Sequence, residues 1–233
     1  MTNDTPALHN PFQSERIMKS IKQFWTLFAL CLGLVAALPA SAQTQAETPD
    51  ALIKRISHQV LDAARTDPQI QAGNHRRVME VVEEHIFPHV DFQRMTALAV
   101  GRFWREATPE QQKRLTEEFR TLLVYTYSGA ISQARDQRIE FRPFRADPAD
   151  NEVEVRSQIV QPRGEPVQLN YRLQRTQAGW KIYDVSVLGA WLVESYKNTF
   201  ASEIGKGGID GLINTLAERN KRLAASAARG SRS

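Results

Sequence analysis

An apolar segment near the start of the chain constrains most strongly what the remainder can fold into. Residues 18–42 have a basic beginning, an apolar run from Phe24 to Leu38 and small residues at 40–42. This is the pattern of a cleaved secretory signal, and the run is shorter than the ~20 residues that a membrane-spanning helix needs. We therefore expect a mature chain that begins at Gln43 and is soluble outside the cytoplasm.

The only cysteine, Cys31, falls inside this segment, so no disulfide framework is available to the mature chain. A lipid-modified Cys31 is the alternative, but bulky Leu30 precedes it where a small residue is usually required. The fold must then be held by a hydrophobic core, which a chain of this length can bury. We expect an N-terminal extension and signal over 1–42, one domain over 43–224 and a disordered tail over 225–233.

Apolar residues recur at helical spacing through the first half of the mature chain. Asp50 and Asp91 are placed to cap helices, and Thr108 with Gln111 resembles a capping box around Pro109. Breaks are expected at Gly73–Asn74 and at the proline that follows Phe87. Four helices are predicted, over residues 51–64, 75–86, 92–100 and 109–133.

Beyond Asp136 the apolar period becomes two, which is typical of half-buried strands. Short connections rich in Pro and Gly favour an antiparallel meander. Helical spacing returns after Gly189, and Gly205, Gly207 and Gly208 separate this helix from a last one over 209–223. Strands are predicted around 139–141, 153–159, 167–173 and 180–182. The sequence thus predicts an α+β fold, with helices packed on one side of a curved antiparallel sheet of about four strands.

Charge and motifs exclude several function classes. The formal net charge is +4, but basic and acidic residues are interleaved, unlike the clustered basic face of a nucleic-acid-binding protein. His85 and His89 have the spacing of metal ligands, yet Pro88 disfavours a regular helical turn between them. The segment Gly205–Gly211 lacks the ending of a phosphate-binding loop. We expect no nucleic acid, metal or cofactor.

One polar constellation leaves an alternative open. Asp184 beside Tyr183, with Tyr171 across the sheet, could form a buried acid–base pair. A strand carboxylate that accepts a hydrogen bond from neighbouring backbone is the interpretation we favour. The alternative function is an enzyme, or a sensor of hydrophobic ligands, that acts on small molecules in an NTF2-like cavity.

Two long stretches resemble a known family. They are FPHVDFQRMTALAVGRFWREATPEQQKRLTEEFRTLLVYTY (87–127) and GWKIYDVSVLGAWLVESYKNTFASEIGKGGIDGLINTL (179–216). In their order and spacing, the Gly-x-x-Trp segment, Thr-Pro-Glu-Gln, Trp-x-Ile-Tyr-Asp-Val and Gly-Ile-Asp resemble the MlaC (toluene-tolerance, Ttg2-type) periplasmic phospholipid-binding proteins. The resemblance extends from about Leu52 to Leu223. It departs at Ala190–Trp191, where the family usually has an aliphatic residue and Ser, so Trp191 either narrows a pocket or faces out.

The resemblance implies an NTF2-like part and a helical part that enclose a deep apolar pocket for acyl chains. It implies a carrier without catalysis, metal or cofactor, which maintains outer-membrane lipid asymmetry. The implied partners are a phospholipid ligand, an outer-membrane lipoprotein–porin complex and an inner-membrane ABC transporter complex with an MCE-domain ring. A pocket for two acyl chains should be large, near the upper end of the usual range. The residues predicted to line it are Met95, Phe119, Leu123, Tyr127, Val155, Leu169, Tyr171, Leu173, Ile182, Leu192, Tyr196 and Phe200.

Overall fold

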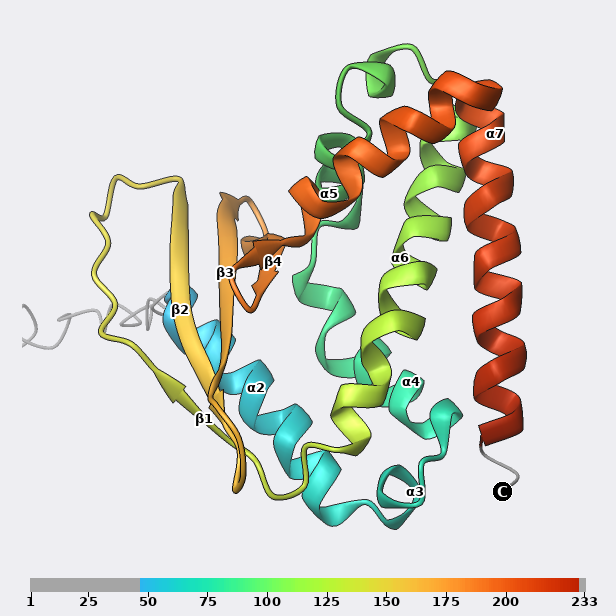
Figure 1. The fold of residues 1–233 in the computed structure, drawn as a ribbon. Coiled ribbons are helices and arrows are strands. Elements are labelled where there is room, and N and C mark those ends of the chain that lie inside the picture. Colours follow the sequence, from blue (N-terminus) through green and yellow to red (C-terminus); the bar gives the residue numbers. More distant parts are fainter. Residues whose placement is uncertain (1–46, 231–233) are drawn as a thin grey trace, which may run out of the picture. The chain divides into compact units, whose positions relative to one another are not determined.

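The computed structural model describes residues 47–230, which form an α+β fold (Figure 1). The expectations for the signal segment, Cys31 and Gln43 lie outside these residues. Within 47–230, no helix combines the length and the apolar character needed to span a membrane. The helical elements before the sheet are α2 (Pro49–Thr66), α3 (Pro68–Gln71), α4 (His75–His85), η1 (Phe87–His89), α5 (Phe92–Val100), η2 (Gly101–Arg105) and α6 (Pro109–Ser132).

The first helix begins and ends differently from the prediction. Thr48, not Asp50, is the N-cap of α2, because Pro49 occupies the first helical position and the Thr48 hydroxyl accepts from the Ala51 amide at 3.4 Å. The helix ends at Thr66, two residues beyond the predicted end at Ala64 and before the break expected at Gly73–Asn74. Asp67 intervenes there, and its carboxylate accepts from the first free amides of α3.

Two other predicted caps are confirmed. The Asp91 carboxylate accepts from the Arg94 amide at 2.8 Å at the start of α5. At the start of α6, the Thr108 hydroxyl accepts from the Gln111 amide, while the Gln111 side chain accepts from the Thr108 amide. This reciprocal capping box satisfies two of the amides that a helix start leaves without partners.

The sheet is an antiparallel meander of five strands in the order β1-β2-β3-β4-β5, so the expected number of about four is one short. The added strand β5 has only two residues, too few to show a period in the sequence. A bulge at Arg172/Leu173 leaves Tyr183 without an opposite partner in β3. The strands are β1 (Arg138–Phe141), β2 (Glu152–Val160), β3 (Val167–Thr176), β4 (Gly179–Val187) and β5 (Ala190–Trp191).

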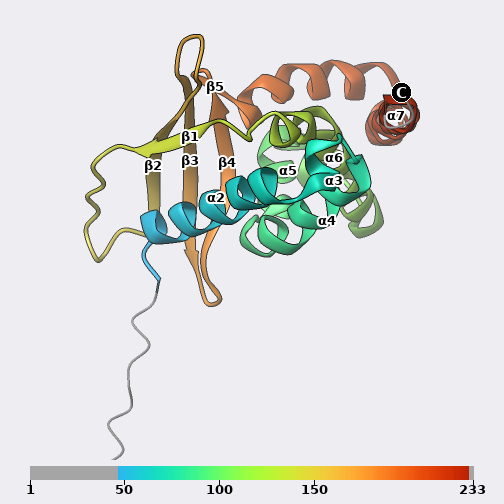
Figure 2. The ribbon, with the colours of Figure 1, turned by 90° about the horizontal axis from the view of Figure 1, so that it is seen from below.

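One face of the sheet packs against helices, with α2 crossing it and the other helices gathered beside it (Figure 2). Val155, Leu173 and Ile182 on this inner face are buried against Leu52, Ile53 and Ile56 of α2. A second core lies away from the sheet, where α5, α6 and α7 (Leu192–Gly230) bury a larger apolar cluster. The helical part therefore has a filled interior of its own.

The last helix bends where its glycines predict a break. Gly207 and Gly208 have non-helical angles, and Gly208 has φ 67° and ψ −170°, which glycine adopts readily. The part of α7 beyond the bend lies on the far side of α6 from the sheet (Figures 1 and 2). It continues to Gly230, so residues 225–230 are helical rather than disordered, consistent with an alanine-rich sequence.

Candidate functional site: an apolar cavity between the helices and the sheet

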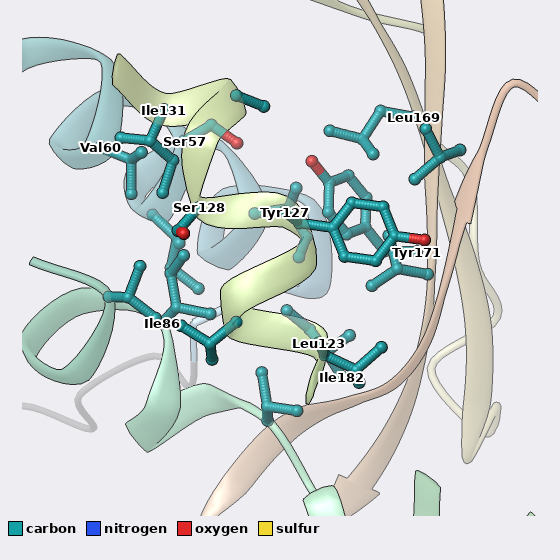
Figure 3. Close-up of a pocket in the computed structure, with 18 of the residues that line it drawn as sticks. Ser57, Val60, Ile86, Leu123, Tyr127, Ser128, Ile131, Leu169, Tyr171 and Ile182 are labelled. Carbon is teal, nitrogen blue, oxygen red and sulfur yellow. The ribbon is translucent and has the colours of Figure 1, made fainter. Parts of the chain in front are cut away.

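An apolar cavity of about 390 Å³ lies between α2, α4 and α6 on one side and the inner face of β1–β4 on the other (Figure 3). Its lining contains no charged side chain. The helical wall consists of Ile53, Ile56, Ser57, Val60, Leu61, Val82, Ile86, Leu123, Val124, Tyr127, Ser128, Ala130 and Ile131, with Phe92 and Met95 from α5 and Leu192 from α7. The sheet supplies Ile139, Ile159, Val167, Leu169, Tyr171, Ile182, Val185 and Val187, and connecting segments supply Phe87, Val90, Ala134 and Gln137.

Few polar groups reach this cavity. They belong to Ser57, Tyr127, Ser128, Gln137 and Tyr171. Burial raises the pKa of the Tyr171 hydroxyl to about 12, although the nearby hydroxyls of Ser157 and Ser57 act in the opposite direction. Ser157 in turn donates to the Leu169 carbonyl at 2.6 Å. Tyr171 is therefore neutral at physiological pH.

Tyr127 lies at the solvent-accessible part of the cavity. Its side chain, from α6, and that of Tyr171, from β3, lie between α6 and the sheet (Figure 3). Tyr127 is 38% exposed. Burial and, secondarily, nearby Tyr196 raise the pKa of the Tyr127 hydroxyl, so this residue is also uncharged. A long apolar molecule would meet no ionised group along these walls.

Comparison with known proteins decides the family. A family model described as MlaC protein matches residues 54–218, which is most of the chain. The chain belongs to the MlaC family. It is 24% identical over 180 residues to the toluene tolerance protein ttg2D of Pseudomonas putida, covering 77% of this chain and 83% of that protein. It is 20% identical over 202 residues to the intermembrane phospholipid transport system binding protein MlaC of Haemophilus influenzae, covering 85% and 93% respectively.

A solved structure extends the likeness of this MlaC family member to three dimensions. A phospholipid-binding protein from Ralstonia solanacearum, determined in complex with a phospholipid, is 44% identical with a TM-score of 0.72. The match covers 75% of this chain and 98% of that one. The predicted α+β fold and the predicted family are thereby confirmed.

Of the twelve residues predicted to line a pocket in this MlaC protein, seven do line the cavity. They come from α5, α6, β3, β4 and the start of α7. Their contact with a lipid stays a prediction. They are Met95, Leu123, Tyr127, Leu169, Tyr171, Ile182 and Leu192.

The other five do not line the cavity. Phe119 and Phe200 are buried in the core of α5, α6 and α7, with ring centroids 5.0 Å apart, and Tyr196 packs against them. Val155 and Leu173 are buried against α2, where Leu52, Ile53 and Ile56 pack over them. All five face inward as predicted, but neighbouring side chains fill the space around them.

Sequence reasoning missed the contribution of α2 and α4. The α2 face that carries Ile53, Ile56 and Val60 was predicted only as an apolar helix face, although it forms a large part of the helical wall. Its i, i+3, i+4 spacing identifies an apolar face but not what that face touches. The second half of β4, residues 183–187, was also missed, because the predicted strand covered only 180–182. Because the bulge at Tyr183 shifts the alternation, Ile182 and Val185 both point into the cavity.

The candidate acid–base pair is divided between the two faces of the sheet. Tyr171 faces the cavity, whereas Asp184 lies opposite Arg172 on the outer face and Tyr183 donates to Glu152 at 2.9 Å. Asp184 is 2% exposed and accepts from the amides of Val185 and Val193. Burial raises the pKa of this carboxyl. The favoured interpretation, a carboxylate that binds neighbouring backbone, is confirmed.

The departure from the MlaC pattern at Trp191 leaves the cavity open. The Arg172 guanidinium stacks 3.8 Å from the centre of the Trp191 ring, and Trp191 is absent from the cavity wall. His85 and His89 are separated as expected, because α4 ends at His85 and η1 contains His89. Within residues 47–230, no group of three His, Cys, Asp or Glu side chains is arranged to hold a metal ion.

Proposed function

We propose that this protein is a periplasmic phospholipid carrier that holds acyl chains in the cavity between α2, α6 and the sheet. The observation that carries the proposal is a cavity of about 390 Å³ whose lining is apolar and contains no charged side chain. The phospholipid-bound relative, which is 44% identical, supports the choice of ligand. Asp184, the candidate base of the enzyme alternative, faces away from this cavity. We therefore propose no catalytic step and no cofactor.

The physical need for a carrier follows from the hydrophobic effect. Two acyl chains contain roughly 30 methylenes, and at about 0.8 kcal/mol each their exposure to water costs ~25 kcal/mol. Release into the aqueous phase would therefore be too slow for transport. A carrier must keep the chains in an apolar lining and leave the polar headgroup in water.

The observed cavity is smaller than the pocket near the upper end of the usual range that two acyl chains led us to expect. Its volume of about 390 Å³ lies near the lower end of the roughly 300–1,000 Å³ range of ligand pockets. Each methylene that enters this apolar lining contributes about 0.8 kcal/mol of hydrophobic free energy.

The pathway belongs to the same proposal. The MlaC membership and the Haemophilus relative, named as part of an intermembrane phospholipid transport system, support a carrier that moves between two membranes. We propose an outer-membrane lipoprotein–porin complex and an inner-membrane MCE-domain ABC transporter complex as its partners, and outer-membrane lipid asymmetry as the outcome. We also propose secretion with cleavage after Ala42.

Paired substitutions on one strand test the proposal. Leu169 lines the cavity, while its neighbour Gln168 is exposed on the opposite face. Leu169→Asp should abolish phospholipid retention, because an unpaired carboxylate in an apolar wall is strongly disfavoured. Gln168→Asp adds the same charge and should retain lipid.

Lipid extracted from each purified protein is quantified by mass spectrometry, and circular dichroism with thermal melting checks that each variant is folded. Wild-type protein that is folded, contains no lipid and takes up no fluorescent phospholipid would contradict the carrier proposal. If Leu169→Asp unfolds, Leu169→Asn provides a milder polar substitution for the same comparison.

A further inference from the structure

We propose that Arg94 is a positioning residue for lipid retention, because it fixes the β-bulge that directs two side chains of β4 into the cavity. This inference rests on the proposed carrier function and assigns the cavity wall a support that lies outside it. Arg94 belongs to α5 and does not line the cavity. It acts through Tyr183, the extra residue of the bulge.

The bulge determines which side chains of β4 reach the cavity. Successive side chains of a regular strand point to opposite faces, so residues three apart face opposite ways. Ile182 and Val185 are three apart, yet both line the cavity, because Tyr183 has no opposite partner in β3. Regular pairing would turn one of the two side chains to the outer face. The wall therefore depends on keeping Tyr183 in its unpaired position.

Arg94 and Glu152 together hold the Tyr183 side chain, and none of the three residues lines the cavity. The guanidinium carbon of Arg94 lies 3.9 Å from the centre of the Tyr183 ring, and Tyr183 is 9% exposed. One Glu152 oxygen accepts from Arg94 at 2.6 Å, and the other accepts from the Tyr183 hydroxyl at 2.9 Å. The Arg94 guanidinium, and next the Tyr183 hydroxyl, hold the pKa of Glu152 below its usual range. The ring is thus held at its face and at its hydroxyl.

The same arginine anchors α5, which forms another part of the cavity wall. Phe92 and Met95 of α5 line the cavity and flank Arg94 in the sequence. Arg94 also donates to the Gln174 side chain, which in turn donates to the Asp91 carboxylate at 2.6 Å. Through these contacts and those to Glu152 and Tyr183, one side chain connects α5 with β2, β3 and β4.

The exposure of these groups favours a role in positioning over a large contribution to stability. The side chains of Arg94 and Glu152 are 28% and 53% exposed. Ion pairs in contact with water contribute little to folding stability, because the solvent weakens the attraction. Loss of the guanidinium should therefore leave the protein folded, while Tyr183 is no longer held in the bulge. A shift of β4 by one residue would then turn its lining side chains away from the cavity.

The test measures how fast each purified protein, loaded with NBD-labelled phosphatidylethanolamine, loses this lipid to an excess of phosphatidylcholine vesicles. Arg94→Met keeps a long side chain but removes the guanidinium, and we expect at least fivefold faster loss. Arg77→Met is the matched control. Arg77 has a side chain that is 34% exposed, pairs with Asp67 at 2.6 Å and with Glu80 at 2.8 Å, and does not line the cavity. This control should change the rate by less than twofold, and melting temperatures are measured on the same samples.

A second variant tests whether Arg94 acts through Tyr183. Tyr183→Phe keeps the ring beside Arg94 and removes only the hydroxyl that donates to Glu152, so lipid loss should become at least twofold faster. When it is combined with Arg94→Met, the rate should exceed that of Arg94→Met alone by less than twofold, because both changes act on the same bulge.

Three results would overturn the role of Arg94 while leaving the carrier function standing. They are a wild-type rate for Arg94→Met, equal acceleration by Arg94→Met and Arg77→Met, and full additivity in the double variant. If Arg94→Met does not fold, the rate of Tyr183→Phe decides, because acceleration supports the proposal and an unchanged rate overturns it. Wild-type protein that takes up no fluorescent phospholipid would instead refute the carrier function. The two failures are therefore distinguishable.

Discussion

Replacing Asp184 with Asn should preserve the fold and lipid binding while making stability less dependent on pH. The Asp184 carboxylate accepts from the amides of Val185 at 2.9 Å and Val193 at 3.1 Å. Val193 lies in the first turn of α7, so this strand side chain satisfies an amide that the helix itself leaves free. An Asn amide oxygen can accept the same two hydrogen bonds.

The sign of the pH effect follows from the direction of the pKa shift. Burial is the largest influence and raises the pKa of Asp184 above its ordinary value of 3.8, although the two amides and Arg172 act in the opposite direction. The folded state therefore binds this proton more tightly than the unfolded state. The stability that Asp184 contributes is present below pH 3.8 and is lost as the pH rises through the folded-state pKa. Asn does not titrate, so the variant should gain stability relative to the wild type between acidic and neutral pH.

The magnitudes separate the roles of hydrogen bonding and charge. Asp184→Asn should change the free energy of unfolding at pH 7 by less than about 1 kcal/mol, because one 3.5 Å ion pair with half-exposed Arg172 is lost while burial of a charge is relieved. Asp184→Ala leaves the buried Val193 amide without its acceptor, which costs about 1–3 kcal/mol. The Ala variant measures the hydrogen bonds, and the Asn variant measures the charge.

Urea unfolding of both variants and the wild type at pH 4 and pH 7 provides the assay, with lipid retention measured on the same samples. Other carboxyl groups titrate equally in all three proteins, so the differences isolate Asp184. A loss above about 2 kcal/mol for Asp184→Asn at pH 7 would show that ion pairing outweighs burial and would refute this reasoning. If Asp184→Asn abolished function in cells while lipid binding and stability stayed intact, the Asp184 carboxylate would have a catalytic role and the simple carrier account would be wrong.

Two further substitutions test the division between filled core and cavity. Phe119→Ala should lower the free energy of unfolding by about 3–5 kcal/mol in urea titrations, because the fully buried ring packs against Tyr196 and Phe200. The folded fraction should still retain lipid. Trp191→Ser should lower stability by about 0.5–2 kcal/mol through loss of the Arg172 stack. Lipid capacity per folded molecule should stay unchanged, and an increase would show that Trp191 limits the cavity.

Local sequence signals predicted the elements well where one residue type has one physical role. The Asp91 cap, the Thr108–Gln111 capping box and the Gly207–Gly208 bend each act through the adjacent backbone. The failures occur where neighbouring elements decide the outcome. Asp50 is a suitable capping residue in isolation. Thr48, followed by Pro49 at the first helical position, caps the helix two residues earlier. The bulge at Tyr183 depends on how β3 and β4 pair, which no single strand encodes.

The candidate site was predictable as a set of inward-facing residues but not as a cavity. Periodicity assigned Leu123 and Phe119 to the same inward side of α6, and both are indeed buried. Leu123 meets open space because α2 and the sheet are held apart there, whereas Phe119 meets the rings of α7. The distinction depends on the distance between elements far apart in the sequence. Apolar residues show the same helical spacing in the sequence whether they pack into a filled core or line a cavity.

The division between a filled and a hollow interior also explains how this protein can maintain a cavity without disulfides. The walls of an open space of about 390 Å³ lack the van der Waals contacts that a filled core would provide, which lowers stability. Residues 47–230 contain no cysteine, so packing must offset this cost. The α5–α6–α7 core, with Leu115, Phe119, Leu122, Leu212 and Ile213 each at most 1% exposed, is built from elements that border the cavity only in part. Stability is therefore concentrated on one side of α6, and the space for a ligand lies on the other.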